Sequence, residues 1–251
     1  MLIFLIITLL FTKFYALFNV GALYYNFEGL YRGWMAKELL DGAGWWYIFN
    51  HPYFQAEGGS VTISYIASLF FLIFGGSFFS LTLVSILFSV LILTVFYLLL
   101  KRHFGIYAAI MFSFLFIFSP NRFFYHSLFT TGAHFQSILF TIMGLFCFFE
   151  IFFNENYYKA YIENAPNKKI NLLFIYMGII SGFGIYFDYI YIIMLITIIL
   201  FWLFIDRRFF LKKYFFVFLS GFLIGLLPWV VYNCTHNFMG LVINGYAPSE
   251  I

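Results

Sequence analysis

Charged side chains are scarce in this sequence of 251 residues, because Asp, Glu, Lys and Arg together make up only 9% of it. A soluble domain carries roughly a quarter charged residues. Hydrophobic residues account for 64%, and the mean hydropathy is +0.97. This composition excludes a soluble globular protein. It predicts an all-α protein that crosses the membrane several times, since helices satisfy their own backbone hydrogen bonds in lipid.

Cysteine is also rare. Cys147 lies within an apolar segment and Cys234 in a polar tail, so no disulfide framework is expected. The sequence also lacks the C-x-x-C and H-E-x-x-H spacings of metal sites, a Gly-rich phosphate loop and a basic patch for nucleic acid. The chemistry of this protein is therefore expected from polar residues near the ends of its apolar segments.

The apolar segments are long enough to account for most of the chain. A membrane-spanning helix needs about 20 apolar residues to cross a core of ~30 Å. The segments occupy residues 2–25, 61–74, 78–100, 106–118, 132–153, 172–205 and 215–232. The stretch 172–205 is too long for one span, and Asp188 with its neighbouring tyrosines divides it into two. The stretch 61–74 is short.

The basic residues predict the topology, because cytoplasmic loops of membrane proteins are rich in Lys and Arg. If residues 61–74 form a re-entrant or surface helix, nine cations share the inner side: Lys101, Arg102, Lys159, Lys168, Lys169, Arg207, Arg208, Lys212 and Lys213. Arg32, Lys37 and Arg122 then lie outside, while Lys13 either snorkels to the interface or faces the bundle. This arrangement predicts seven spans with the N-terminus inside.

The same topology places a long first loop, residues 26–77, on the outer face. Two helical stretches are expected within it. The polar tail after Tyr232 also falls on the outer side, and the sequence is compatible with the N-terminal part of a longer protein. The polar residues with chemical potential therefore converge on one side of the membrane.

Several short motifs follow one another in a characteristic order. An acid, Glu28, follows the first apolar segment, and then come Tyr31 and the run AKELLDG at 36–42. Further along lie LIFGGS at 72–77, YLLLKRHFG at 97–105, Ser119-Pro120 and GFLIGLLPWVVYN at 221–233. In this order the motifs resemble the membrane half of the GT-C glycosyltransferases. The similarity is to the protein mannosyltransferase and aminoarabinose transferase relatives of glycosyltransferase family 39, and it covers nearly the whole chain.

The resemblance implies one GT-C-like transmembrane domain over residues 1–251, with about seven transmembrane helices and two juxtamembrane helices in the first outer loop. Such enzymes transfer a sugar from a polyprenyl-phosphate donor to an acceptor glycan, lipid or protein. The expected location is the plasma (inner) membrane, with the active site on the outer face. No cofactor is certain, and dependence on a divalent metal stays open.

The family usually carries an Asp-Glu pair after the first span. Alignment on residues 36–42 places Glu28 at the first acid and Gly29 at the second. One acid is thus retained as its longer homologue, and the other is missing. This departure bears directly on whether the chain is active.

Glu28 is the candidate catalytic base, because inverting sugar transfer needs a group that takes the acceptor proton, and a carboxylate suits this role. The alternative is an acid favoured by the dipole of the helix that follows. Arg122 and Arg32 are candidates for the donor phosphate, since a guanidinium offers paired donors. The alternatives are a lipid-headgroup anchor for Arg122 and simple solvation for Arg32.

Five further residues are candidate substrate contacts. His126 and His134 flank the entry to a predicted span, where interfacial histidines are also common. His51 and Glu57 lie in the loop between the two surface helices, where related enzymes place substrate contacts. Asp188 lies near membrane depth, where an acid suggests a functional site, although the topology places it at a solvated outer turn.

Two other classes of function compete with the transferase. A transporter or flippase would need polar residues at mid-membrane and repeated halves with broken helices. A non-catalytic or truncated relative would bind a lipid-linked sugar without transferring it, and Gly29 favours this alternative.

Overall fold

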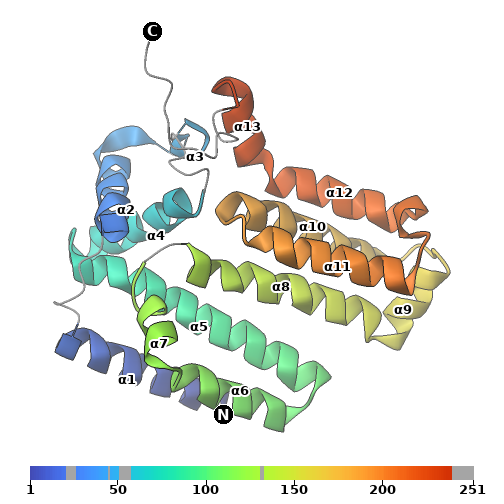
Figure 1. Cartoon of the computed structure of the whole chain (residues 1–251), viewed down its shortest axis with the longest axis horizontal. Helices are drawn as coiled ribbons and strands as arrows, with labels where there is room; N and C mark the ends of the chain where they lie inside the picture. The colour runs from blue at the N-terminus through green and yellow to red at the C-terminus, as the bar shows by residue number, and fades with distance from the viewer. Residues whose placement is uncertain (21–26, 45, 51–57, 131–132, 239–251) are drawn as a thin grey trace. The chain divides into compact units, whose positions relative to one another are not determined.

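The computed structural model describes residues 1–20, 27–44, 46–50, 58–130 and 133–238. Within these ranges all regular elements are helices, so the all-α prediction is confirmed (Figure 1). The chain divides into two compact units. Unit 1 contains Met1–Gly42 and Ile63–Phe146, and unit 2 contains Ala43–Thr62 and the chain from Cys147 onward.

Unit 1 is built around the long helix α5 (Phe78–His103), which packs against α1 (Leu2–Val20) and α6 (Ile106–Ile117) (Figure 1). Its other elements are α2 (Phe27–Glu38), most of α4 (Gly59–Phe74), α7 (Asn121–His126) and the first part of α8 (His134–Phe152). The side chain of Ser77 caps the start of α5 by accepting a hydrogen bond from the Ser80 amide.

Lys13 of α1 lies in the interior of unit 1. Its Nζ donates to the Ser127 hydroxyl and sits 3.7 Å from the centre of the Phe124 ring. The Ser89 hydroxyl donates to the Ser127 carbonyl oxygen over 2.9 Å. Of the two predicted alternatives, Lys13 therefore faces the bundle and does not snorkel.

Unit 2 contains three neighbouring helices, α10 (Lys168–Phe187), α11 (Tyr191–Ile205) and α12 (Lys213–Gly225), which run side by side in Figure 1. It also contains the end of α8, α9 (Glu155–Ile162) and the 3-10 turn η4 (Phe209–Leu211). The short helix α3 (Tyr47–Asn50) packs against α13 (Leu227–Thr235).

Glycines bring α10 and α12 into close contact. A Cβ atom added at Gly178 or Gly182 would overlap the backbone of α12, and one at Gly221 or Gly225 would overlap the backbone of α10. Each pair is spaced four residues apart, which is the small-residue pattern that lets helices approach closely in membranes. This contact fixes α10 and α12 against each other.

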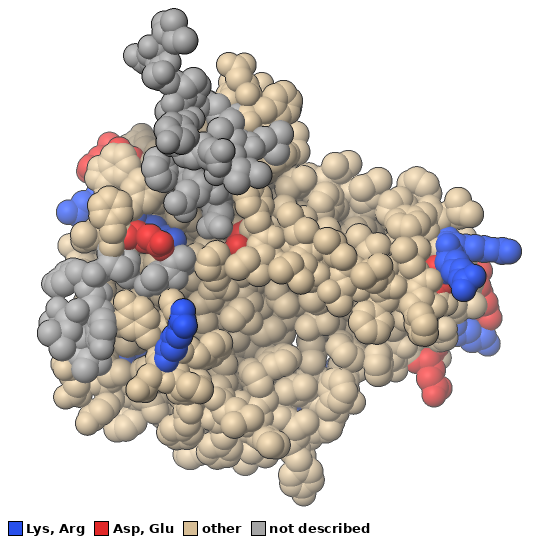
Figure 2. Space-filling model, viewed as in Figure 1, with Lys and Arg blue, Asp and Glu red and all other residues tan. Residues whose placement is uncertain are grey.

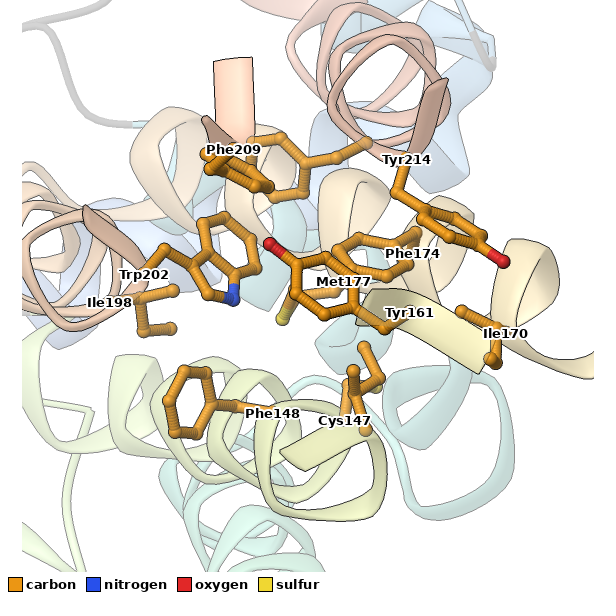
Figure 3. Packing of buried hydrophobic residues seen from close by; sticks show 12 residues of the cluster. Cys147, Phe148, Tyr161, Ile170, Phe174, Met177, Ile198, Trp202, Phe209 and Tyr214 are labelled. Carbon is orange, nitrogen blue, oxygen red and sulfur yellow. The ribbon is translucent and has the colours of Figure 1, made fainter. Parts of the chain in front are cut away.

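Aromatic rings form much of the buried cluster of unit 2, together with smaller apolar side chains such as Met177 and Ile198 (Figure 3). The fully buried Trp202 lies 4.2 Å from Phe209 and 5.8 Å from Phe174, measured between ring centres. Phe174 in turn stacks on Tyr214 at 5.1 Å. Pairs at such distances stabilise a core beyond the area they bury, so one aromatic cluster joins α10, α11, η4 and α12.

Four of the described helices are long and apolar enough to cross a membrane, or five if one bent pair counts as a single span. The four are α1, α5, α8 and α10. Gly59–Phe74, Ile106–Ile117 and Tyr191–Ile205 are shorter apolar helices. A multi-pass membrane protein is confirmed, while the count of seven spans stays a prediction.

The last apolar segment is bent in the structure. Lys213–Gly225 and Leu227–Thr235 are separate helices that meet at an angle of 56°. Pro228 lies in the first turn of α13, where its missing N–H is tolerated, but it cannot continue the hydrogen bonds of α12. The last apolar segment is therefore a bent helix pair, and its assignment as one span stays a prediction.

Candidate functional site

Helix α2 carries Glu28 and Arg32, two of the predicted site residues. It runs from Phe27 to Glu38 and continues as a π-helical turn, Leu39–Ala43, in which Gly42 has a φ of 108°. Glu28 in the first turn and Lys37 in the last complement the helix dipole. The predicted helical run after Glu28 is thus confirmed, and the glycine permits its end.

Glu28 and Arg32 form an ion pair one helical turn apart, with 3.5 Å between Oε2 and Nη2. The Arg32 side chain is only 3% exposed, whereas that of Glu28 is 53% exposed. The backbone oxygen of Arg32 accepts a hydrogen bond from the Ser64 hydroxyl over 3.0 Å. The interpretation of Arg32 as a solvated residue is therefore wrong, because the bundle buries it. The pair presents an accessible carboxylate beside a fixed guanidinium.

A cavity of about 340 Å³ lies against a different face of α2. Leu30, Trp34 and Phe71 form part of its apolar wall, and Lys37 and Ser77 contribute its polar groups. The sequence analysis missed this cavity. Only its α2 side carried a signal in the sequence, because the spacing of Gly29, Gly33 and Lys37 places small residues and a cation on one stripe.

The remaining candidates of unit 1 lie on other helices. Arg122 and His126 are one turn apart on α7, so the helix brings them to the same side. Arg122 is exposed, and the His126 ring packs edge-on against Tyr125 with 5.6 Å between ring centres. His134 is the exposed first residue of α8. His51 and Glu57 lie outside the described residues.

Asp188 marks the break between α10 and α11, as predicted, but it is fully buried. Its Oδ1 accepts a hydrogen bond from the Ile190 amide over 3.0 Å, and its own amide donates to the Gly184 oxygen over 2.9 Å. The expectation of a solvated carboxylate is wrong, because the side chain turns inward and holds the break. Two residues before Asp188, the backbone carbonyl oxygen of Tyr186 accepts a hydrogen bond from the Gly58 amide over 2.8 Å.

A polar cluster in unit 2 escaped the sequence analysis. Lys212 Nζ lies 2.8 Å from Asp206 Oδ2, and the Tyr161 hydroxyl donates to the same oxygen over 3.1 Å. Burial acts to raise the pKa of Asp206, but hydrogen bonds from Lys212, the Arg208 amide and Tyr161 outweigh it, so the pKa is lowered. Burial, followed by the Asp206 charge, raises the pKa of Tyr161. The sequence did carry a signal for this cluster, because the apolar segment ends in the charged run Asp206-Arg207-Arg208.

The described residues were also compared with the requirements of a metal site. Among the residues that the structure describes, no three His, Cys, Asp or Glu side chains gather in a way that could hold a metal ion. The dependence on a divalent metal stays an open prediction.

Comparison with known proteins identifies the family. Residues 59–232, more than half of the chain, match the family model described as dolichyl-phosphate-mannose-protein mannosyltransferase. No curated protein and no solved structure matches the chain. The matched range contains the short helix α4, the α10–α12 contact and the break at Asp188, while Glu28 and Arg32 precede it. The resemblance found in the motifs is confirmed, and the chain belongs to the dolichyl-phosphate-mannose-protein mannosyltransferase family of GT-C glycosyltransferases.

Proposed function

We propose that this protein transfers a sugar from a polyprenyl-phosphate donor to an acceptor on the outer face of the membrane, with Glu28 as the general base. The observation that carries the proposal is the Glu28–Arg32 pair, in which a half-exposed carboxylate is held by a buried guanidinium. Family membership supplies the reaction class. The donor lipid and the membrane face are supported by the motif resemblance and the distribution of basic residues.

The proposed chemistry uses one proton transfer and one displacement. The acceptor hydroxyl attacks the anomeric carbon, and its proton moves to Glu28. The bond between the anomeric carbon and the phosphate oxygen breaks, and the polyprenyl phosphate leaves with the electron pair. Arg32 keeps the carboxylate in place, and a fixed positive charge near the site favours the developing phosphate charge.

Arg122 has a separate proposed role. It is exposed at the start of α7, directly after the Ser119-Pro120 turn. An accessible guanidinium can pair with the donor phosphate through two parallel hydrogen bonds. His126, one turn further on, can add a hydrogen bond to the same group or to the sugar.

The proposed sidedness rests on the two ends of α10. Its first turn carries Lys168 and Lys169, and its last residues lead into Asp188. Figure 2 shows Lys and Arg, together with Asp and Glu, gathered at the end of unit 2 where α9 and the connection between α11 and α12 lie. Basic residues favour the cytoplasmic side, so this end is assigned to the inside and the Asp188 end to the outside.

Substitution of Glu28 in the full gene product tests the proposal. The substrate is radiolabelled polyprenyl-phosphate mannose, and the measured quantity is the transfer rate. Glu28→Gln should lower the rate by about 10²- to 10⁴-fold, as expected for loss of a general base, with donor binding much less affected. Glu28→Asp keeps a carboxylate but shortens its reach by one methylene, and it should keep partial activity.

Glu38→Gln is the matched control, because Glu38 is an acid at the other end of α2 with no assigned role. It should transfer at close to the parental rate. Parental activity of Glu28→Gln would refute the assignment and move attention to Glu57 and Asp188.

A non-catalytic relative is the second candidate, and Gly29 favours it. This buried glycine occupies the position at which the family carries its second acid. A protein of this kind would bind the lipid-linked sugar with no transfer. Retained donor binding without measurable transfer by the parental full-length protein, in the presence of its acceptor, would select this candidate. The bend between α12 and α13 is a feature that the transporter alternative also expects.

A further inference from the structure

The cavity beside α2 combines apolar walls with a cation. Its walls include Leu30, Phe71, Phe78 and Leu81, and none of its lining residues is acidic. Its volume of about 340 Å³ lies near the lower end of the ~300–1,000 Å³ range of ligand pockets. A cavity of this size and chemistry suits one hydrocarbon chain with an anionic group at its end.

Lys37 reaches the turn at which α5 begins. Gly75 adopts a φ of +78° in this turn, and a Cβ atom added at the next residue, Gly76, would lie 3.1 Å from Lys37 Cε. The absence of a side chain at Gly76 therefore leaves room for the lysine. Ser77 caps α5 at the same place, and the start of a helix carries partial positive charge. An anion at the end of the cavity would thus meet Lys37 and this helix end together.

Two apolar residues of the cavity lining are exposed. Leu30 is 57% exposed and Trp34 is 52% exposed, and both line the cavity. Tryptophan prefers the boundary between hydrocarbon and headgroups. An occupant can therefore enter laterally from the bilayer, with its charged end at the level of Lys37.

The cavity and the Glu28–Arg32 pair face different ways. Successive residues of an α-helix are turned by about 100°. Glu28 and Arg32 therefore lie on the opposite side of α2 from Leu30, Trp34 and Lys37, and neither lines the cavity. A donor lipid in this cavity would present its sugar away from the proposed base, so the occupant is a different lipid.

We infer that this cavity binds one chain of an anionic phospholipid from the surrounding bilayer, with the lipid phosphate on Lys37. The site holds the juxtamembrane helix α2 against α4 and the start of α5. The choice of a phospholipid over the donor lipid rests on the proposed role of Glu28. The presence of the cavity and of Lys37 in its lining does not depend on that role.

Gly33→Leu tests the hydrocarbon part of the site. A Cβ atom at Gly33 would lie 3.8 Å from the Phe71 ring, an ordinary contact, so a larger side chain can extend into the cavity. Phosphatidylglycerol and, separately, phosphatidylcholine are added to the purified full-length protein in detergent, and the midpoint of thermal unfolding is measured. Phosphatidylglycerol should raise the midpoint of the parent more than phosphatidylcholine does, and Gly33→Leu should lose this difference.

Lys37 substitutions test the charged part. Lys37→Ala should lower the affinity for phosphatidylglycerol about fivefold, so that about five times more lipid is needed for the same rise of the midpoint. This is the effect of about one basic residue at a membrane surface. Lys37→Glu should abolish the preference for phosphatidylglycerol over phosphatidylcholine. Lys37 is exposed, so these variants stay informative if Gly33→Leu does not fold. Lys101→Ala, at the other end of α5, is the control and should respond as the parent does.

Three outcomes would overturn the inference. Equal responses of the parent to the two phospholipids would remove the charge selectivity, and an unchanged response of folded Gly33→Leu or of Lys37→Glu would remove the site. Stabilisation by farnesyl phosphate but not by phosphatidylglycerol would assign the cavity to the donor lipid. Glu28→Gln should keep the parental phosphatidylglycerol response, so a failure of the proposed catalytic base is recognised separately in the transfer assay.

Discussion

The two units hold their helices together in different ways. In unit 1, side-chain hydrogen bonds link helices, from Lys13 to Ser127 and from Gln136 to Ser85 over 3.2 Å. In unit 2, the glycines of α10 and α12 bring the backbones into contact, and the aromatic cluster around Trp202 fills the space beside them. Lipid tails are as apolar as the helices themselves, so neither unit can rely on the hydrophobic effect alone.

The difference predicts how each unit responds to substitution. A hydrogen bond between membrane helices contributes only about 0.6 kcal/mol on average, and a bonded pair can lose one member and leave the packing intact. Close backbone contact depends on shape, and any added atom disturbs it. Unit 2 should therefore be the more sensitive of the two to changes in side-chain volume.

Trp202→Ala should have the largest effect on stability. The indole is fully buried against Phe209 and Phe174, and truncation of a buried Trp costs about 3–5 kcal/mol. Chemical unfolding in detergent should show this loss. Phe204→Ala on the same helix is the control, since Phe204 is exposed, and a comparable loss there would contradict the cluster as the centre of unit 2.

Gly182→Leu should come next. Its side chain would overlap the backbone of α12 at Phe222, and overpacking costs about 1–3 kcal/mol or more. The midpoint of thermal unfolding and the fraction of monodisperse protein measure the effect. Gly33→Ala, which adds a Cβ where there is room, should be neutral or stabilising; equal losses in both variants would break the contrast.

Unit 1 should show a smaller and asymmetric effect. Ser127→Ala leaves the buried Lys13 amine without this acceptor and should cost up to about 1.7 kcal/mol. Lys13→Met should cost less, because the Ser127 hydroxyl keeps its hydrogen bond to the Phe124 oxygen, 2.7 Å away. The two variants are compared by chemical unfolding, and a greater loss for Lys13→Met would reverse the interpretation.

The smallest expected effect is the contribution of Asp206 to the pH dependence of folding stability. Its pKa is lowered in the folded protein, so it contributes stability above its unfolded pKa of about 3.9. This contribution is lost as the pH falls through the lower, folded value. Asp206→Asn should reduce the loss of thermal stability between neutral and acidic pH, whereas Glu163→Gln, an exposed acid of unit 2, should leave it unchanged. A steeper acid loss in Asp206→Asn would contradict the shift.

Much of the fold follows from linear patterns. The apolar run that starts at Phe78 and ends in basic residues is α5, and the break at Asp188 lies where the polar residue interrupts the apolar stretch. The bend before α13 carried a signal in Pro228. The burial of Asp188 and Arg32 did not, because a hydropathy pattern describes neighbours along the chain and not the helices that cover a residue.

The candidate site was predictable to a similar degree. The helix that follows the first apolar segment was expected, and Glu28 and Arg32 are spaced to meet on it. The cavity was missed because its wall combines α2 with Phe71 and the start of α5, residues that are distant in the sequence. The catalytic role of Glu28 stays a prediction.

The hydrogen bond from Gly58 to Tyr186 constrains the order of assembly during synthesis. Gly58 and helix α3 belong to unit 2, where they pack with residues that the ribosome adds much later, near Tyr186 and in α13. The residues on both sides of this segment, in α2 and in the later part of α4, belong to unit 1. Nascent chains that end before Tyr186 therefore carry Gly58 and α3 without these partners, and the contacts form only after the chain has been made as far as α13.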